Sequence, residues 1–206
     1  MRLAAFDLEG TLVDITSWEA LHEKFGTCEK AKRNMELFFS GKISYEEWAR
    51  LDASLWRGHT KEEIIELFKN VEPKPGAREL FEFLRESGFK TAIISGGLMC
   101  LARRIGEMLG ADYIFANELV FDEKGRITGE VIIRVNFHEK GRIMMALKEK
   151  LRPELTVAVG DWHNDVPMFK EADLSIALRD SLGADYIATD LWEVMKIIET
   201  ALKNRV

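Results

Sequence analysis

A pair of carboxylates directly after a buried strand is the feature that most constrains this chain. The apolar run at residues 3–6 predicts a short buried strand, and Asp7, Glu9 and Gly10 follow it. Carboxylates are rarely buried unless they are paired or bind a metal. In an open α/β sheet, ligands bind at the carboxyl ends of the strands. The position of the pair therefore predicts a cation or a reacting group at the end of the first strand.

Composition narrows the class of protein. The chain has 206 residues, enough for one full core and a smaller accessory unit. A formal net charge of −6 argues against nucleic acid as a partner. No apolar run approaches the ~20 residues of a membrane span. Because Cys28 and Cys100 suggest free thiols, and a core strand begins too early for a signal peptide, we expect a cytoplasmic protein.

Alternating strand and helix patterns predict an α/β fold. From residue 77 onward, apolar runs alternate with segments of helical spacing, which implies a parallel sheet with right-handed crossovers. Two β-like stretches flank residues 122–125 within 119–134 and predict a hairpin. The expected class is a Rossmann-like, doubly wound parallel sheet. The predicted strands are 3–6, 91–94, 113–116, 155–159, 175–178 and 186–188, and the predicted helices are 77–87, 98–109, 139–150 and the tail from 191.

A helical insertion interrupts this pattern after the first strand. Residues 16 to about 70 predict about four short helices, two of which start with capping boxes at 44–47 and 60–63. Pro73, Pro75 and Gly76 mark the return to the strand-rich pattern. We therefore predict a core formed by residues 1–14 and 73–206, and a cap formed by residues 15–72. The expected hinges lie near 14–16 and 71–76.

Polar residues follow three of the predicted strands, and parallel strand ends converge on one edge of a sheet. Besides Asp7 and Glu9, these are Ser95 with its two following glycines, and the loop that starts at Asp161. Clustered carboxylates suit Mg²⁺. A hydroxyl and backbone N–H groups at a helix start suit an anion, and Lys140 adds a positive charge. Together they predict a phosphate held between a divalent cation, a lysine and backbone amides.

The order of these residues resembles the phosphatases of the haloacid dehalogenase (HAD) superfamily. Within it, the helical insertion and the hairpin are most similar to the phosphoserine phosphatase branch. The segments that carry the resemblance are Asp7-Leu8-Glu9-Gly10-Thr11 for the first motif, Ser95-Gly96-Gly97 for the second, Lys140-Gly141 for the third, and Gly160-Asp161 with Asn164-Asp165 for the fourth.

The resemblance implies a role for each residue. Asp7 would attack phosphorus and form an aspartyl-phosphate. Glu9 would protonate the leaving alkoxide and then activate water. Asp7, the backbone oxygen of Glu9, and Asp161 would bind Mg²⁺. The phosphate would be held by Ser95, the Gly96 amide, Lys140 and Asn164, with Asp165 orienting Lys140 or a metal-bound water from behind.

The implied activity is a Mg²⁺-dependent phosphomonoester hydrolase acting on a small phosphorylated metabolite. Two alternatives stay open: a phosphomutase or phosphotransferase of the same superfamily, and a non-catalytic phosphoacceptor similar to response-regulator receivers.

Glu9 stands where the superfamily usually has Asp. Thr16 and Asp52 stand where phosphoserine phosphatases usually carry the Glu and Arg that grip serine, so a phosphoserine-like substrate is one candidate among several. The oligomeric state is left open.

Overall fold

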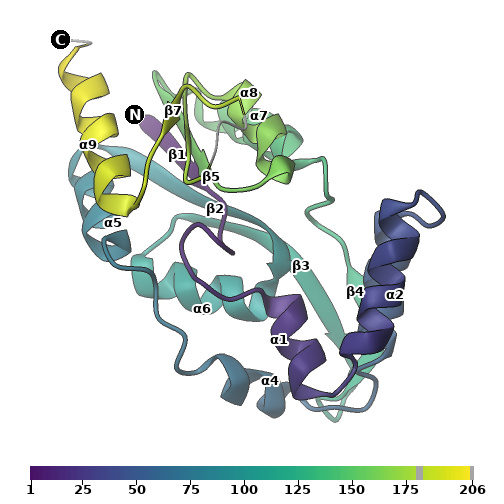
Figure 1. The fold of residues 1–206 in the computed structure, drawn as a ribbon. Helices are drawn as coiled ribbons and strands as arrows, with labels where there is room; N and C mark the ends of the chain where they lie inside the picture. The colour runs from purple at the N-terminus through teal and green to yellow at the C-terminus, as the bar shows by residue number, and fades with distance from the viewer. Residues whose placement is uncertain (180–182, 205–206) are drawn as a thin grey trace.

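The computed structural model describes residues 1–179 and 183–204. In these residues, strands form a seven-stranded sheet in the order β4-β3-β2-β1-β5-β6-β7 (Figure 1). Neighbouring strands pair in parallel except β3 and β4, which are antiparallel. The strands are β1 Arg2–Phe6, β2 Phe89–Leu98, β3 Tyr113–Phe121, β4 Ile127–Ile132, β5 Thr156–Gly160, β6 Leu174–Ala177 and β7 Tyr186–Ile187.

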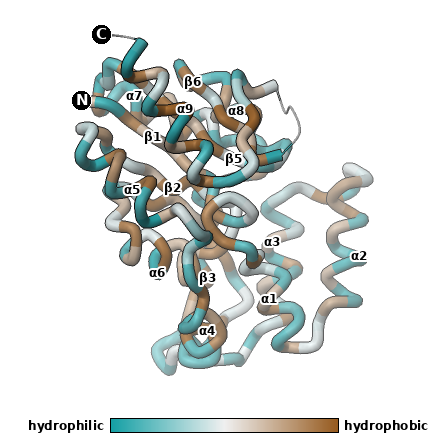
Figure 2. The backbone as a smooth tube through the Cα atoms, turned by 60° about the vertical axis from the view of Figure 1, so that its left-hand side comes forward, coloured by the Kyte–Doolittle hydropathy of each residue, from teal (hydrophilic) through white to brown (hydrophobic). Residues whose placement is uncertain are grey.

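Helices cover both faces of this sheet, as a doubly wound fold requires. Alternate residues of β1 point to opposite faces: Phe6 packs with α5 (Ala77–Glu86), α6 (Met99–Leu109) and α9 (Leu191–Lys203). Leu3 packs on the other face with α7 (Lys140–Leu151) and α8 (Val166–Glu171). Figure 2 shows hydrophobic stretches along β1, β2 and β5 in the interior. The α/β fold expected from the sequence is confirmed.

The chain changes direction across the sheet beside β1. It runs from β1 to β2 and β3 on one side, and later enters β5 on the other side. Ligands in open α/β sheets bind at such a switch point, outside the carboxyl ends of the strands. The residues that follow β1 and β5, Asp7 and Asp161, therefore come together at this point.

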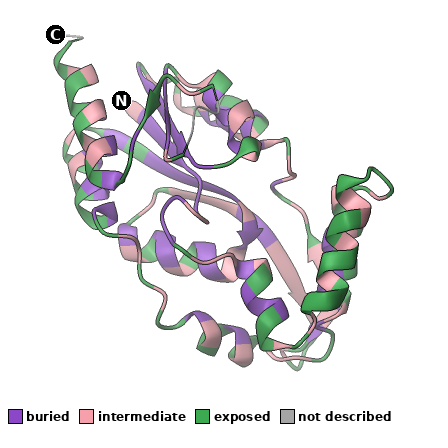
Figure 3. Ribbon diagram, in the orientation of Figure 1, coloured by how far each residue is buried: buried purple, intermediate pink, exposed green. Residues whose placement is uncertain are grey.

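Four helices lie between β1 and α5. They are α1 Ser17–Lys24, α2 Cys28–Phe39, α3 Tyr45–Ser54 and α4 Lys61–Phe68. The capping boxes predicted for the third and fourth helices are both present, at Ser44 and Thr60. Helix α2 has no buried residue along its length and lies on the outside of the group (Figure 3). Backbone hydrogen bonds from the α3–α4 connection to Ile127 join these helices to β4.

Two strands extend further than the apolar runs predicted. Strand β2 continues through Ser95, Gly96 and Gly97 to Leu98, with a shift in its register against β3 after Ile94. The extended backbone therefore runs on past the apolar segment. Strand β3 joins the predicted 113–116 strand to the first arm of the hairpin. The hairpin therefore reaches from the core sheet to the helices between β1 and α5.

The two connections between the core and the four helices run side by side. The Lys74 amide donates to the carbonyl of Leu12 at 2.8 Å, and the Lys74 Nζ lies 2.9 Å from Asp14 Oδ1. The predicted extents of cap and core, and the hinges in these connections, stay predictions. The predicted core range also includes 180–182 and 205–206, which lie outside the described residues.

Candidate active site

A buried lysine between two aspartates forms the centre of the site. Lys140, the first residue of α7, is fully buried. Its Nζ donates to Asp7 Oδ1 at 2.5 Å and to Asp165 Oδ1 at 2.6 Å. The Asp7 amide donates to the carbonyl of Val159, which fixes the end of β1 against β5. The structure thus brings together residues from the first, third and fourth predicted motifs.

Burial dominates the electrostatics of this cluster. Desolvation raises the pKa of Asp7 well above its usual value, although Lys140 opposes the shift. For Lys140, burial acts against the charged form, but the carboxylates of Asp165 and Asp7 outweigh it and raise the pKa of the lysine. The two carboxylates therefore favour the charged form of Lys140, and a second cation beside Asp7 would offset the desolvation of its carboxylate.

Asp161 lies at the end of β5 within reach of the same cluster. Its Oδ1 accepts a hydrogen bond from Thr11 Oγ1 at 3.0 Å. Burial first, and then the neighbouring Asp165, raises the pKa of Asp161. Its carboxylate packs directly against Gly10, where a Cβ would collide with it, and the φ of +88° at Gly10 also favours glycine. The glycine of the first motif makes room for the aspartate of the fourth.

Among the residues that the structure describes, three carboxylates form a group that fits a divalent cation. Ligand oxygens of Asp7, Asp161 and Asp165 all lie within 4.8 Å of one another. Both oxygens of Asp165 are already engaged, Oδ1 by Lys140 and Oδ2 by the amides of Asp161 and Trp162. Asp7 and Asp161 are therefore the better ligands. An all-oxygen donor set of this charge suits a hard cation.

Glu9 is not a member of this group of three acids, and its carboxyl is held by Ser17. Its Oε1 accepts hydrogen bonds from the Ser17 amide at 2.9 Å and from the Ser17 hydroxyl. The carboxyl packs against Gly97, at which a Cβ would collide with Glu9 Oε1. Burial raises the pKa of Glu9 against the opposing effect of the Ser17 bonds. The metal contact predicted for the Glu9 backbone oxygen stays a prediction.

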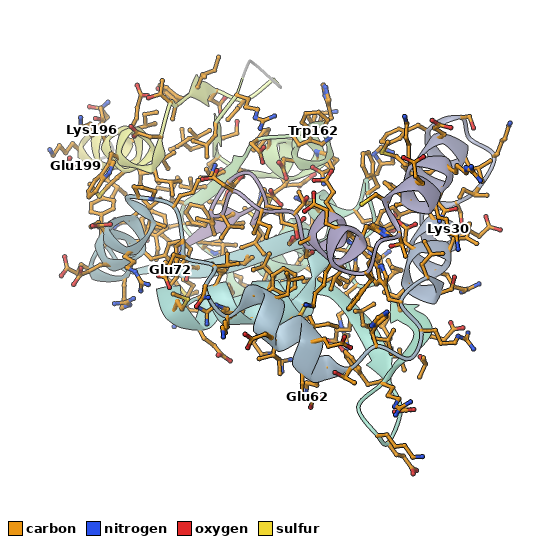
Figure 4. The ribbon with its side chains drawn as sticks, turned by 60° about the horizontal axis from the view of Figure 1, so that its bottom comes forward. Lys30, Glu62, Glu72, Trp162, Lys196 and Glu199 are labelled. Carbon is orange, nitrogen blue, oxygen red and sulfur yellow. The ribbon has the colours of Figure 1, made fainter. Side chains whose placement is uncertain are left out.

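Of the predicted phosphate-binding residues, Ser95 and Asn164 lie next to Gly96, whereas Lys140 contacts Asp7 and Asp165. The Ser95 hydroxyl accepts a hydrogen bond from the Gly97 amide at 3.0 Å. A Cβ at Gly96 would lie 3.6 Å from the Tyr45 hydroxyl and 3.9 Å from Asn164 Nδ2. Asn164 Oδ1 is buried without a hydrogen-bond partner among the described residues. Trp162, on the same loop, is 49% exposed, and Figure 4 shows it at the surface.

Comparison with known proteins decides the family. The family model of haloacid dehalogenase-like hydrolases matches residues 1–173. The chain belongs to this family. A phosphoserine phosphatase of Methanocaldococcus jannaschii is 33% identical over 209 residues, which cover 96% of this chain and 98% of that protein. This HAD-like hydrolase therefore falls within the phosphoserine phosphatase-like branch, and it is an enzyme of the phosphatase type.

Two further likenesses extend this result. A phosphoserine phosphatase of Archaeoglobus fulgidus is 36% identical over 86% of this chain, but the chain spans only about half of that protein, 52% of its length. A solved structure described as a phospho-aspartyl intermediate analogue of phosphoserine phosphatase superposes with a TM-score of 0.81. It is 33% identical and covers 95% of this chain and 97% of its own. In the described part of this HAD-like hydrolase, no helix has the length and apolarity to cross a membrane.

Three residues of this HAD-like hydrolase that the motifs did not single out meet at the carbonyl of Gly96. Trp18 Nε1 donates to it at 3.1 Å, the Tyr45 hydroxyl at 3.2 Å, and Asn117 Nδ2 at 2.9 Å. Trp18 and Tyr45 come from α1 and α3, and Asn117 comes from β3. Their spacing in the sequence carries no common pattern, so only the fold reveals that they border the segment 95–97.

Thr16 and Asp52, which stand where phosphoserine phosphatases usually carry Glu and Arg, have partners among the four helices. The Thr16 hydroxyl donates to Glu19 Oε2 at 2.6 Å. Asp52 is buried, accepts from Asn34 Nδ2 at 2.7 Å, and lies 3.3 Å from His22 Nε2. Both side chains are therefore engaged within this helical group.

The two cysteines of this HAD-like hydrolase are predicted to differ in reactivity. Burial raises the pKa of the Cys100 thiol to about 12, whereas Cys28 is exposed. Because the thiolate is the reactive form, we expect iodoacetamide at pH 8 to modify Cys28 at least about tenfold faster than Cys100. Peptide mass spectrometry of a time course measures both rates. Equal rates would contradict the buried environment of Cys100.

Proposed function

We propose that this protein is a Mg²⁺-dependent phosphomonoester hydrolase that acts on a small phosphorylated metabolite through an aspartyl-phosphate on Asp7. The observation that carries the proposal is the contact of Lys140 with Asp7, beside Asp161 and one strand away from the loop at Gly96. A carboxylate nucleophile, a cation site and an anion-binding loop are the parts that phosphoryl transfer requires.

The proposed reaction has two steps. In the first, an Asp7 oxygen bonds to phosphorus while the ester oxygen leaves with its electron pair and takes a proton from Glu9. In the second, Glu9 removes a proton from water, the water oxygen bonds to phosphorus, and the Asp7–phosphorus bond breaks. The pKa of Glu9 is raised by burial, which suits a group that must give and then take a proton near neutral pH.

Lys140 and the loop residues balance the charge of the phosphoryl group. Lys140 orients Asp7 and brings a positive charge to the phosphate oxygens. The Gly96 amide, the Ser95 hydroxyl and Asn164 are proposed to donate to the same oxygens. Asp165 orients Lys140, since it accepts hydrogen bonds from Lys140 and from two backbone amides. Fixed donors of this kind stabilise the charge that develops during transfer.

A divalent cation fits beside these groups. Asp7, Asp161 and the backbone oxygen of Glu9 would hold it, and when bound it supplies positive charge to the phosphoryl oxygens. Mg²⁺ is the proposed ion because it binds one or two carboxylates together with substrate phosphate. The buried oxygens of Asp7 and Asp161, both with raised pKa values, support this role.

Removal of the metal tests the proposed function most simply. With p-nitrophenyl phosphate as substrate, we expect dialysis against EDTA to reduce phosphate release at least about 10²-fold, because the metal contributes several kcal/mol. Added Mg²⁺ should restore it. Phosphate and p-nitrophenol are measured together. Full activity in the metal-free protein would contradict the proposed metal dependence.

Substitution of Glu9 tests the acid–base role. We expect Glu9→Gln to slow turnover by about 10²–10⁴-fold, because the amide keeps its place beside Ser17 but transfers no proton. The phosphoenzyme should then accumulate, which acid-quenched mass spectrometry detects. Glu19→Gln, an exposed acid on α1, is the matched control and should retain full activity. Unchanged turnover in Glu9→Gln would exclude this role.

The two alternatives differ from hydrolysis in the fate of the phosphoryl group. A phosphotransferase or phosphomutase would pass it to a second alcohol, so alcohol release would exceed phosphate release when an acceptor is present. A receiver-like phosphoacceptor would keep the wild-type phosphoenzyme for minutes. The Glu9 carboxyl, which Ser17 holds against Gly97, is the group proposed to activate water, and it favours rapid hydrolysis instead.

The substrate panel follows from the relatives. Several are named phosphoserine phosphatase, and one solved structure at 32% identity is described as a substrate-bound complex of that enzyme. Phosphoserine therefore heads the panel of small phosphorylated metabolites, followed by sugar phosphates and nucleotides.

Both cysteines are free, which supports the proposed cytoplasmic location.

A further inference from the structure

Glu9 marks the side of the site on which the alcohol departs. As the proposed acid it must reach the ester oxygen, so the leaving group lies beyond the contact between Glu9 and Gly97. Ser17, which holds Glu9, is followed by Trp18 on α1. Trp18 and Tyr45 both donate to the carbonyl of Gly96. The leaving group therefore meets aromatic side chains on this side.

Tyr45 belongs to a cluster of five aromatic rings that borders the site. We call it the ring cluster, formed by Phe38, Phe39, Tyr45, Trp48 and Phe137. Phe38 stacks on Trp48 with ring centroids 4.7 Å apart and lies 5.5 Å from Phe137. Tyr45 lies 6.0 Å from Phe38 and 6.3 Å from Phe137. Because Phe137 comes three residues before Lys140, the cluster spans α2, α3 and the segment that leads into the core of the site.

Three charged groups lie close enough to affect the pKa of Tyr45, namely Glu9, Lys140 and Glu46. Each already has a hydrogen-bond partner within the chain. The side chains that contact the Gly96 carbonyl are all uncharged: Trp18, Tyr45 and Asn117. Burial raises the pKa of Tyr45, so its hydroxyl stays neutral at physiological pH. A bound ammonium or carboxylate would lose its hydration here without an opposite charge from these contacts, which disfavours its binding.

A polar donor inside the ring cluster lacks a partner. The indole nitrogen of Trp48 is buried and has no hydrogen-bond partner among the described residues. Buried donors are normally satisfied, so such a group invites an acceptor from outside the chain. An uncharged ring that carries an oxygen would satisfy it and stack on the neighbouring rings at the same time.

From these contacts, and resting on the proposed function, we propose that the enzyme selects phosphomonoesters of uncharged aromatic or apolar alcohols. The ring cluster receives the alcohol portion while Gly96 and Lys140 receive the phosphate. Phosphoserine, whose alcohol portion carries both an ammonium and a carboxylate, is then a poor substrate. Aromatic stacking and burial of a ring both favour such an alcohol, so a preference of at least about tenfold is expected.

Three esters of primary alcohols test this selection, because they share the same reacting bond. They are 2-phenylethyl phosphate, ethyl phosphate and O-phosphoserine. We expect kcat/KM for 2-phenylethyl phosphate to exceed that for ethyl phosphate at least tenfold, and O-phosphoserine to lie below both. A higher kcat/KM for O-phosphoserine than for 2-phenylethyl phosphate would overturn the inference. Absence of phosphate release from all three would instead overturn the proposed function, and this inference with it.

Variants of the ring cluster connect the preference to these rings. Trp48→Ala and Phe38→Ala should each lower the ratio of kcat/KM between 2-phenylethyl and ethyl phosphate at least about fivefold. The ratio is taken on one preparation, so a loss of folded protein leaves it unchanged. Tyr186→Ala, which removes an exposed ring on β7 outside the cluster, is the control and should keep the wild-type ratio. An unchanged ratio in both cluster variants would overturn the role of the rings.

Discussion

Asp7→Asn is expected to lower phosphatase activity at least about 10⁴-fold, because the amide cannot serve as the nucleophile and the enzyme has no second route to an acyl phosphate. The substitution keeps the shape of the side chain and an oxygen for Lys140. Burial disfavours the charged form of Asp7, whereas the substitution also removes one of the two carboxylates paired with Lys140. These effects oppose each other, so we expect only a small change in stability. Phosphate release from p-nitrophenyl phosphate and a thermal melt measure the two effects.

A matched control separates the nucleophile from a general loss of charge. Asp14 lies on the same segment after β1, and its side chain is 84% exposed. Asp14→Asn should retain activity within about threefold, because it touches none of the reacting groups. If Asp7→Asn kept a rate comparable with Asp14→Asn while remaining folded, Asp7 would not be the group that attacks phosphorus.

The second large effect is expected for Lys140→Met. The variant leaves Asp7 and Asp165 as buried carboxylates without their cation, and removal of one partner from a buried ion pair costs about 3–5 kcal/mol. Urea unfolding in metal-free buffer at pH 7 measures the loss in the free energy of unfolding. Activity should fall as well, because the phosphate loses its positive neighbour.

Two further variants make this prediction specific. Lys150→Met on the same helix, where the lysine packs over the Tyr113 ring, should cost less than about 1 kcal/mol. Adding Asp165→Asn to Lys140→Met should recover part of the lost stability, because one unpaired carboxylate is removed. A loss in Lys140→Met no larger than that in Lys150→Met would show that the buried pair contributes little.

The positions of the main acids could be predicted because they follow directly from strand ends. The apolar run before Asp7 identifies β1, and the run before Asp161 identifies β5. Once both are recognised as parallel strands, their carboxyl ends must share an edge. The start of α3 could be predicted equally well, since the Ser44 capping box is a local pattern that needs no tertiary contact.

Residues whose role depends on tertiary packing could not be predicted in this way. Trp18 and Tyr45 reach Gly96 only because α1 and α3 fold back over β2. The sequence of α3 does not indicate that Asp52 is buried beside His22. The full length of β3 was missed as well, because its apolar run is interrupted before the hairpin and only pairing with β4 extends it.

The central claim is that the phosphoryl group passes through Asp7. The most direct measurement mixes the Glu9→Gln variant with p-nitrophenyl phosphate and Mg²⁺, quenches the mixture in acid within the first turnover, and locates the phosphoryl group by peptide mass spectrometry. We expect one phosphoryl group on the peptide that contains Asp7, and its absence in the variant that also carries Asp7→Asn. Release of p-nitrophenol with no phosphoryl group on Asp7, or with one on Ser95 instead, would contradict the account.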